Sequence, residues 1–282
     1  IAIRTERVYG PYGVAYLGGT MKELRLGIVQ LDTEIGQVDR NFNILAEKVR
    51  ALTKQSVDVV VLPETWNTGF MTGPELHTLA DEDGQRSQSL LQELARSEHV
   101  NIFGGSVAVK EGGSIYNRTY VYNREGELLS TYDKMHGFSP AKEDQFFTGG
   151  NGIHQFELDG VLCSSATCYD IRFPELIRKS ALQGIELFFL PAQWPMLRLH
   201  HWRILNQARA IENQMYFCSA NGCGMIGKLP MAGHSMVVDP WGEVLLECDE
   251  TPQIQTVTID VDTVKDIRSK INVFRDRKPN CY

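Results

Sequence analysis

Short apolar runs of strand length alternate with segments of helical periodicity along this 282-residue chain, which restricts the fold to the α/β class. Residues 24–31 form one such run, and residues 57–62 form a continuous one that is typical of a strand buried on both faces. Between them, Asp39 is placed to cap a helix. The apolar residues of that helix recur three or four positions apart: Phe42, Leu45, Val49 and Leu52.

Three further strands are predicted in the middle of the chain, after a helix over residues 87–98. They cover residues 100–109, 115–122 and 128–132. Gly112-Gly113 and Glu125-Gly126 mark the turns between them, which indicates a meander of hairpins.

The second half repeats the strand and helix alternation. We predict strands over residues 160–167, 186–190, 216–220, 235–238 and 255–259, and helices over residues 173–182 and 200–213. The apolar stripe of the last helix would be Ile204, Ala208, Ile211 and Met215. Mixing of crossover-linked and hairpin-linked strands indicates mixed sheets in a single domain over residues 21–282. Residues 1–20 show no periodicity and precede Met21, so they are interpreted as an N-terminal extension, upstream-translated or vector-derived, or as an arm that packs on a partner subunit.

Charge and cysteine content narrow the functional classes. The net charge of −7 argues against nucleic acid or an anionic membrane surface as the main partner, and no apolar run reaches the ~18 residues of a membrane-spanning helix. Six cysteines without a secretory signal favour reduced thiols and a cytoplasmic location. Metal-binding and nucleotide-binding motifs are absent from the sequence, so no metal or cofactor is expected.

Two charged residues directly follow strand-like runs, where α/β proteins tend to build their sites. Glu64 ends the run Val-Val-Val-Leu-Pro-Glu, and a partly desolvated carboxylate there would suit a general base. Lys134 follows the last hairpin strand, and its ammonium would stabilise an oxyanion and lower the pKa of a nearby thiol. If Glu64 is considered alone, the simpler interpretation is a solvated glutamate in a loop. If Lys134 is considered alone, it is a surface lysine paired with Asp133.

Cys168 carries more information, because it lies where a strand turns into a helix. Backbone N–H groups and a helix N-terminus behind the sulfur would favour the thiolate and supply oxyanion donors, as at a nucleophile elbow. A buried structural cysteine is the alternative, and it is the expected state of Cys163, Cys218 and Cys248. Asp170 and Glu175 are expected to cap the helix and to pair with basic groups.

Three flanked motifs together resemble the nitrilase superfamily of carbon–nitrogen hydrolases. They are Leu62-Pro63-Glu64, Asp133-Lys134-Met135-His136 and Cys168-Tyr169-Asp170-Ile171-Arg172-Phe173-Pro174-Glu175. The resemblance spans Met21 to about Tyr282 and implies a four-layer αββα sandwich, with Glu64, Lys134 and Cys168 as a catalytic triad. It is strongest to the ω-amidase (2-oxoglutaramate amidase) branch, through Gln193-Trp194-Pro195, residues 201–213 and residues 275–279.

Further roles follow from that resemblance. Glu143 would orient Lys134 or the attacking water, with a solvated glutamate in the charged run Lys142-Glu143-Asp144 as the alternative. The backbone N–H of Tyr169 would hold the oxyanion. Arg172 would bind a substrate carboxylate, with a structural ion pair to Asp170 or Glu175 as the alternative, and Trp194 would form a pocket wall or a core contact. The chain departs from its relatives at Gly137, where they carry a bulkier apolar residue, and this change would loosen the loop after Lys134.

The implied activity is that of a thiol-dependent amidase. It would hydrolyse the terminal amide of small carboxylated substrates, such as 2-oxoglutaramate or 2-oxosuccinamate, to an acid and ammonia through a cysteine thioester. One alternative keeps the triad but takes an N-carbamoyl amine or a nitrile. Another, from a different class, is a binding module that keeps the fold without catalysis. The resemblance also implies a homodimer or a higher homo-oligomer formed through one helical face.

Overall fold

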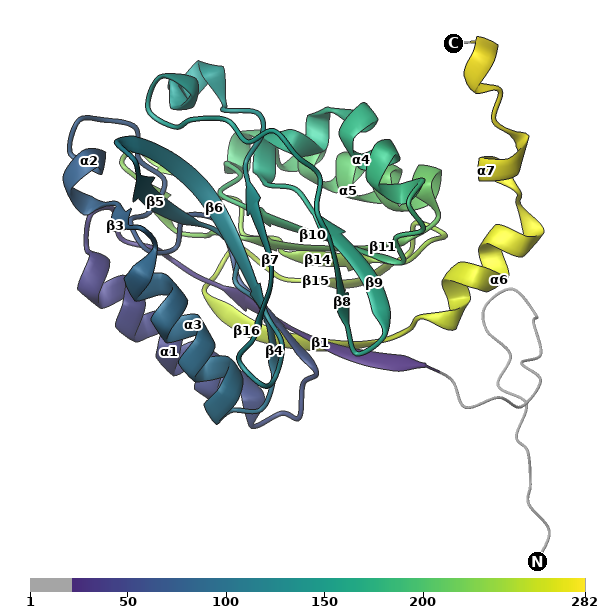
Figure 1. The fold of residues 1–282 in the computed structure, drawn as a ribbon, viewed down its shortest axis with the longest axis horizontal. Coiled ribbons are helices and arrows are strands. Elements are labelled where there is room, and N and C mark those ends of the chain that lie inside the picture. The colour runs from purple at the N-terminus through teal and green to yellow at the C-terminus, as the bar shows by residue number, and fades with distance from the viewer. Residues whose placement is uncertain (1–21, 282) are drawn as a thin grey trace, which may run out of the picture.

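Two mixed β-sheets pack face to face, and helices cover both outer surfaces (Figure 1). The computed structural model describes residues 22–281, so the segment over residues 1–20 lies outside the described residues. The first sheet has eight strands in the order β16-β1-β2-β4-β6-β5-β3, with β7 paired to β6. Its strands are β1 (Glu23–Gln30), β2 (Val59–Val61), β3 (Asp81–Glu82), β4 (Asn101–Phe103), β5 (Val107–Glu111), β6 (Ser114–Tyr122), β7 (Leu128–Asp133) and β16 (Gln253–Asp260).

The second sheet has six strands in the order β15-β14-β11-β10-β9-β8. Its strands are β8 (Gln155–Leu158), β9 (Val161–Ser165), β10 (Leu187–Ala192), β11 (Tyr216–Asn221), β14 (Met236–Val238) and β15 (Val244–Glu247). A separate two-stranded hairpin consists of β12 (Met225–Ile226) and β13 (Leu229–Pro230). Each large sheet contains parallel and antiparallel pairs, which confirms the predicted mixed sheets.

The helices complete four layers in the order αββα, as predicted. Helices α1 and α3 pack on the outer face of the first sheet, whereas α4 and α5 pack on the outer face of the second. The α-helices are α1 (Val38–Thr53), α2 (Leu76–Leu79), α3 (Gln85–Ser97), α4 (Pro174–Ala181), α5 (Leu199–Asn213), α6 (Asp262–Lys270) and α7 (Val273–Asp276). The 3-10 helices are η1 (Ser139–Ala141), η2 (Glu143–Gln145), η3 (Cys168–Arg172), η4 (Met196–Arg198) and η5 (Pro279–Cys281). No helix among residues 22–281 is long and apolar enough to cross a membrane.

The main core lies between the two sheets. Phe103 of the first sheet stacks on Phe189 of the second, with ring centroids 4.7 Å apart. Strand β2 contributes to two cores, because Val59 and Val61 face the second sheet while Val60 faces the helices α1 and α3. This arrangement confirms the prediction of a strand buried on both faces, and it fixes the position of the residues that follow β2.

Two local predictions were wrong. Residues 100–109 form two strands, β4 and β5, because Gly104 and Gly105 carry the chain past the end of β2. A Cβ on Gly105 would lie 2.1 Å from the carbonyl oxygen of Pro63, and the residue has a φ of +61°. Helix α1 begins at Val38, one residue before the predicted cap, so that Asp39 lies in its first turn and pairs with Arg86 at 2.6 Å.

The predicted apolar stripe of α5 was also wrong as a buried face. Ile204 and Ile211 are about half exposed, at 50% and 49%. The buried face instead carries Asn206, Arg209 and Asn213 together with Trp202 and Ala210. These polar groups are tolerated because they are hydrogen-bonded. Arg209 Nε, for example, donates to the carbonyl oxygen of Ile171 at 2.9 Å and so ties α5 to η3.

Candidate active site

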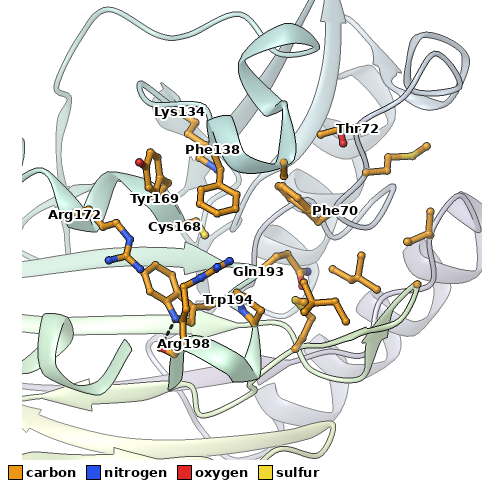
Figure 2. Close-up of a pocket in the computed structure, with 18 residues that line it drawn as sticks. Phe70, Thr72, Lys134, Phe138, Cys168, Tyr169, Arg172, Gln193, Trp194 and Arg198 are labelled. Atoms are coloured by element: carbon orange, nitrogen blue, oxygen red, sulfur yellow. Dashed lines mark hydrogen bonds between the residues drawn. The ribbon is translucent and has the colours of Figure 1, made fainter. Parts of the chain in front are cut away.

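A cavity of about 400 Å³ lies at the carboxyl ends of strands from both sheets (Figure 2). Lys134 follows β7, Cys168 follows β9, and Gln193 and Trp194 follow β10, and all four line the cavity. The other lining side chains are Ile35, Phe70, Met71, Thr72, Phe138, Ala141, Tyr169, Arg172, Pro195, Arg198, Ile226, Leu229 and Met231. The topology therefore brings the ends of strands from distant parts of the chain to one place.

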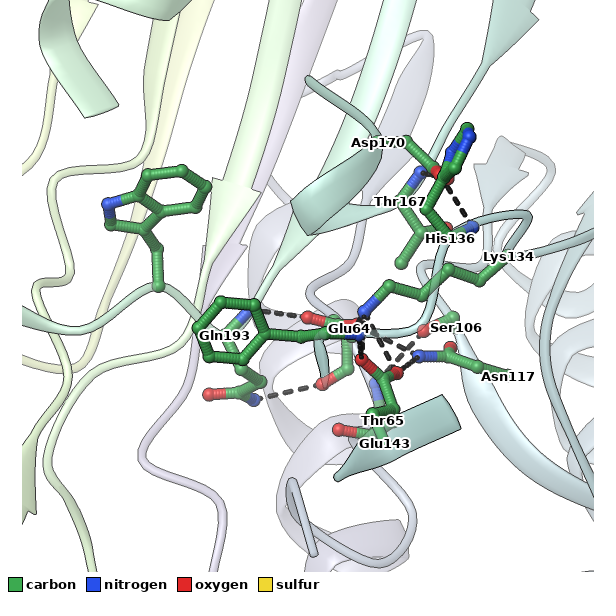
Figure 3. A network of polar contacts seen from close by, with 12 residues as sticks. Glu64, Thr65, Ser106, Asn117, Lys134, His136, Glu143, Thr167, Asp170 and Gln193 are labelled. Atoms are coloured by element: carbon green, nitrogen blue, oxygen red, sulfur yellow. Dashed lines mark hydrogen bonds and ion pairs between the residues drawn. The ribbon is translucent and has the colours of Figure 1, made fainter. Parts of the chain in front are cut away.

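Glu64 is fully buried beside this cavity, not solvated in a loop. Its Oε1 accepts hydrogen bonds from Lys134 Nζ at 2.9 Å and Asn117 Nδ2 at 2.8 Å, and its Oε2 accepts one from the backbone N–H of Gln193 at 2.7 Å (Figure 3). The chain after β2 is fixed by Ser106, whose Oγ accepts from the backbone N–H of Thr65. The carboxylate is thus held in one orientation by three donors.

Lys134 is the centre of a buried network of charges. Its Nζ donates to Glu64 and to both carboxylate oxygens of Glu143, the latter at 2.8 Å each. Glu143 also accepts from the backbone N–H of Phe138 at 2.7 Å and from Asn117 Nδ2 at 3.2 Å. Asn117 on β6 therefore bridges the two carboxylates. Two glutamates share one ammonium in a site from which water is nearly excluded.

The loop after Lys134 is closely packed at Gly137. A Cβ on that residue would lie 2.8 Å from the backbone nitrogen and 2.9 Å from the Cα of Asp144, next to Glu143. The prediction that Gly137 loosens the loop was therefore wrong, since the missing side chain allows two backbone segments to approach. This close approach of the two segments keeps Glu143 within hydrogen-bond distance of Lys134 Nζ.

Burial and neighbouring charges set the ionisation of this network. Burial opposes the charge on Lys134, but Glu143 and Glu64 outweigh it and hold the pKa of the ammonium well above its usual range. Burial also raises the pKa of Glu64, against the lowering effect of Lys134 and with a further contribution from Glu143. A charged lysine thus lies beside a carboxylate with increased affinity for a proton, which is the state required of a general base.

Cys168 occupies a strained turn at the start of η3. Its φ is +46°, in the left-handed region that non-glycine residues rarely adopt, and its side chain is only 8% exposed. Burial and the charge of Glu64 raise the pKa of the Cys168 thiol well above its usual range, although Lys134 opposes them. The predicted preference for a resting thiolate was therefore wrong, because burial outweighs the lysine. The sulfur instead needs a base when it attacks.

Asp170 fixes the turn that carries Cys168. Its Oδ2 accepts from the backbone N–H of Thr167 at 2.9 Å and from the hydroxyl of Tyr132 at 2.7 Å. Its Oδ1 accepts from the backbone N–H of His136 at 3.0 Å and lies 2.7 Å from His136 Nδ1. Asp170 thus belongs to a capping box at the start of η3, whose N-cap is Thr167, and not to a cap of the predicted helix α4. Its basic partner is His136, from the loop after Lys134. Glu175 is exposed in the first turn of α4.

The aromatic and basic residues predicted near the substrate line the cavity. Trp194 is almost fully buried, and the guanidinium of Arg172 lies over its ring at 4.7 Å from the centroid. Arg172 therefore does not form the alternative ion pair with Asp170 or Glu175. Tyr169 packs edge-on against Phe138, with ring centroids 5.1 Å apart.

The sequence did not single out three residues that contribute to this site: Asn117, Gln193 for its backbone N–H, and Arg198. Asn117 lies within a predicted strand, and no sequence motif around it marks it as a functional residue. Arg198 lies in a turn before α5, and only its position in space brings its guanidinium to the cavity. Among residues 22–281 there is no group of three or more His, Cys, Asp or Glu side chains placed to hold a metal ion.

Residues 25–269 match the model of the carbon-nitrogen hydrolase family. The chain belongs to the carbon–nitrogen hydrolase family. The match covers most of the chain, and it agrees with the nitrilase-superfamily resemblance of the three motifs.

Several relatives of this carbon–nitrogen hydrolase support the assignment. It is 39% identical to the 2-oxoglutaramate amidase of Bacillus subtilis over 91% of this chain and 98% of the relative. It is 31% identical to the omega-amidase NIT2 of Danio rerio over 93% and 97% of the two chains. A crystal structure of a CN-hydrolase superfamily protein from Xanthomonas campestris matches with a TM-score of 0.85 at 28% identity, over 92% of this chain and 98% of that one.

Proposed function

We propose that this carbon–nitrogen hydrolase is a cysteine amidase that removes ammonia from the terminal amide of small carboxylated substrates. The observation that carries the proposal is the position of Cys168 in a cavity beside the buried Glu64–Lys134–Glu143 network. The similarity to 2-oxoglutaramate and omega-amidases supports substrates of the 2-oxoglutaramate type.

The first half of the reaction forms a thioester. Glu64 takes the proton from the Cys168 thiol as the sulfur attacks the amide carbon. The resulting oxyanion is held by Lys134 and by the backbone N–H of Tyr169, which follows the nucleophile. Glu64 then passes its proton to the nitrogen, the C–N bond breaks, and ammonia leaves. Glu143 keeps the ammonium of Lys134 in place and acts as a positioning residue.

The second half hydrolyses the thioester. Glu64 removes a proton from water, the hydroxyl oxygen adds to the thioester carbon, and the same donors hold the second oxyanion. The C–S bond then breaks, the sulfur regains a proton from Glu64, and the acid product is released. A raised pKa of Glu64 suits these steps, because the group must accept and return a proton twice in each cycle.

Arg172 is proposed to bind the substrate's carboxylate. It lies in the cavity wall four residues after the nucleophile, and its stacking on Trp194 holds the planar group in place. The amide at the other end of a short acid would then reach Cys168.

Ammonia release from a matched substrate panel tests the proposal. The panel contains 2-oxoglutaramate, 2-oxosuccinamate, glutamine, asparagine, an N-carbamoyl amine and a nitrile. We expect turnover of the 2-oxo amides by the wild-type protein and none by Cys168→Ala, while the control Cys281→Ser, which changes the exposed cysteine, retains activity. Turnover confined to the carbamoyl compound or the nitrile would replace the amidase assignment, and turnover by Cys168→Ala would refute the mechanism.

A further inference from the structure

Two arginines line the same cavity, and each is held by an aromatic ring. The guanidinium of Arg172 lies 4.7 Å from the centroid of Trp194, and that of Arg198 lies 5.0 Å from the centroid of Phe138. In Figure 2 Arg172 lies on the opposite side of Cys168 from Phe70, whereas Arg198 lies below Cys168. Both arginines therefore line the cavity that also holds the nucleophile.

Neither guanidinium has a carboxylate partner among residues 22–281. Arg172 Nη2 lies 3.3 Å from His201 Nδ1, and neither arginine forms an ion pair with an aspartate or a glutamate of the described chain. Arg118, by contrast, is held by both carboxylate oxygens of Asp133 at 2.7 and 3.0 Å. Two partly buried cations without counter-ions are unusual in a folded protein, since burial of unpaired charge is costly.

The two cations also lie close enough to repel each other. Burial lowers the pKa of Arg172, and the positive charge of Arg198 lowers it further. Trp194 contacts both arginines and holds them near each other despite this repulsion. Trp194 carries Arg172 on its ring, and its Nε1 donates to the backbone oxygen of Arg198 at 2.8 Å. The backbone of Trp194 is fixed by its N–H, which donates to Asn221 Oδ1 at 2.7 Å, and the indole packs on Trp202 with ring centroids 5.5 Å apart.

The second aromatic support leads back to the catalytic network. Phe138, under Arg198, donates its backbone N–H to Glu143, the residue that holds Lys134. The guanidinium of Arg198 is thus set at a defined position relative to the network. Preorganised, mutually repelling cations in a cavity wall are the arrangement expected of an anion site, because a bound anion relieves the repulsion.

We propose that Arg198 is a specificity-determining residue that holds the substrate's carboxylate jointly with Arg172. The inference rests on the proposed amidase function. It adds a second arginine to the substrate site and requires that the preferred substrate carry a negative charge. One carboxylate accepts hydrogen bonds from both guanidinium groups, and the carbon chain then runs from the two arginines to Cys168. Neutral amides of the same length lack the anion and gain nothing from Arg198.

Succinamate and succinamide make a matched pair for the kinetic test, because they differ only by a carboxylate in place of a carboxamide. We expect Arg198→Gln to raise the KM for succinamate by roughly tenfold to a hundredfold, as loss of a charge-assisted hydrogen bond predicts. Its kcat/KM for succinamide should stay within about twofold, and Arg198→Lys should recover part of the loss. Arg203→Gln, which removes a surface arginine of α5 that pairs with Glu247, is the control.

Equal losses on succinamate and succinamide would overturn the proposal and indicate that Arg198 only supports the fold. The double variant Arg172→Gln/Arg198→Gln adds a second criterion. If both arginines hold one carboxylate, the double variant should raise KM by less than the product of the factors for the two single variants. An increase in KM equal to that product would contradict joint binding.

Calorimetric binding of succinamate to the Cys168→Ala protein separates this inference from the proposed function. If Arg172 and Arg198 jointly hold the carboxylate, Arg198→Gln should weaken this binding by roughly tenfold or more, although no turnover occurs. Unchanged binding would refute joint binding of the carboxylate while leaving the amidase assignment intact. Absence of amide hydrolysis by the wild-type protein would instead refute the proposed function, whatever the binding result.

Discussion

Replacement of Glu143 by glutamine tests how the buried network works. Glu143 is fully buried and holds Lys134 Nζ with both oxygens at 2.8 Å, but it does not line the cavity. Glutamine keeps the size and one acceptor of the side chain while it removes the charge. Lys134 would then depend on Glu64 alone for ionic contact, and its ammonium would lose one of its three acceptors.

The expected loss can be calculated from these contacts. One charge-assisted hydrogen bond contributes about 1.5–3 kcal/mol, and loss of an oxyanion donor's position lowers kcat by about 10²-fold. A stability loss of about 2 kcal/mol would lower the Tm of a domain of this size by about 4–8 °C. The pH profile should shift as well. Because Glu143 contributes to the raised pKa of Glu64, its neutralisation should move the acid limb of kcat/KM to lower pH.

Steady-state kinetics across pH and a thermal melt measure these effects, with Glu175→Gln as the control on the exposed first turn of α4. A merely structural role for Glu143 would lower Tm without moving the acid limb. If Glu143→Gln keeps kcat within about twofold and leaves the acid limb unchanged, the argument that Glu143 positions Lys134 is refuted.

Three other changes probe separate parts of the structure. Because burial raises the pKa of Glu64, kcat/KM of the wild-type enzyme should fall with decreasing pH, and the midpoint of this fall should lie above the pKa of about 4.3 that is typical of an exposed glutamate. A midpoint at or below that value would contradict the assignment of Glu64 as the base. Gly137→Ala should destabilise the fold by about 1–3 kcal/mol in chemical denaturation, since its Cβ would overlap the backbone of Asp144, and an unchanged midpoint would show that the loop yields. Ile211→Glu should convert the expected homodimer to a monomer in light scattering if the exposed stripe of α5 is its interface, whereas an unchanged mass would exclude that face.

The strands and helices with strong periodicity could be predicted from sequence alone. Strand β2 is an example, because a continuous apolar run has few alternatives to burial on both faces. Strands β8 and β15 and helix α6 were not predicted, since short or polar segments carry little periodic signal. Helix α5 shows a different limit: its buried face carries Asn206, Arg209 and Asn213, whose hydrogen-bond partners are supplied by the fold and cannot be inferred from hydropathy.

The candidate site divides in the same way. Motifs identified Glu64, Lys134 and Cys168, and the structure places them around one cavity and its buried network; their catalytic roles stay predictions until the variants are measured. The thiolate expected at Cys168 was wrong, because sequence indicated the lysine and the turn but not the degree of burial that raises the pKa of the thiol.

The order of residues along the chain determined the alternation of strands and helices, and it placed reactive groups directly after buried strands. Only the tertiary structure decided which of these groups meet. Glu64 and Lys134 are 70 residues apart in sequence, yet they meet because β2 and β7 belong to the same sheet. Glu143 reaches the same lysine because the loop after Lys134 folds back through η2. Arg198 and Arg172 face one cavity for a similar reason. Electrostatic energies depend on distance and on exclusion of water, and both quantities exist only once the chain has folded.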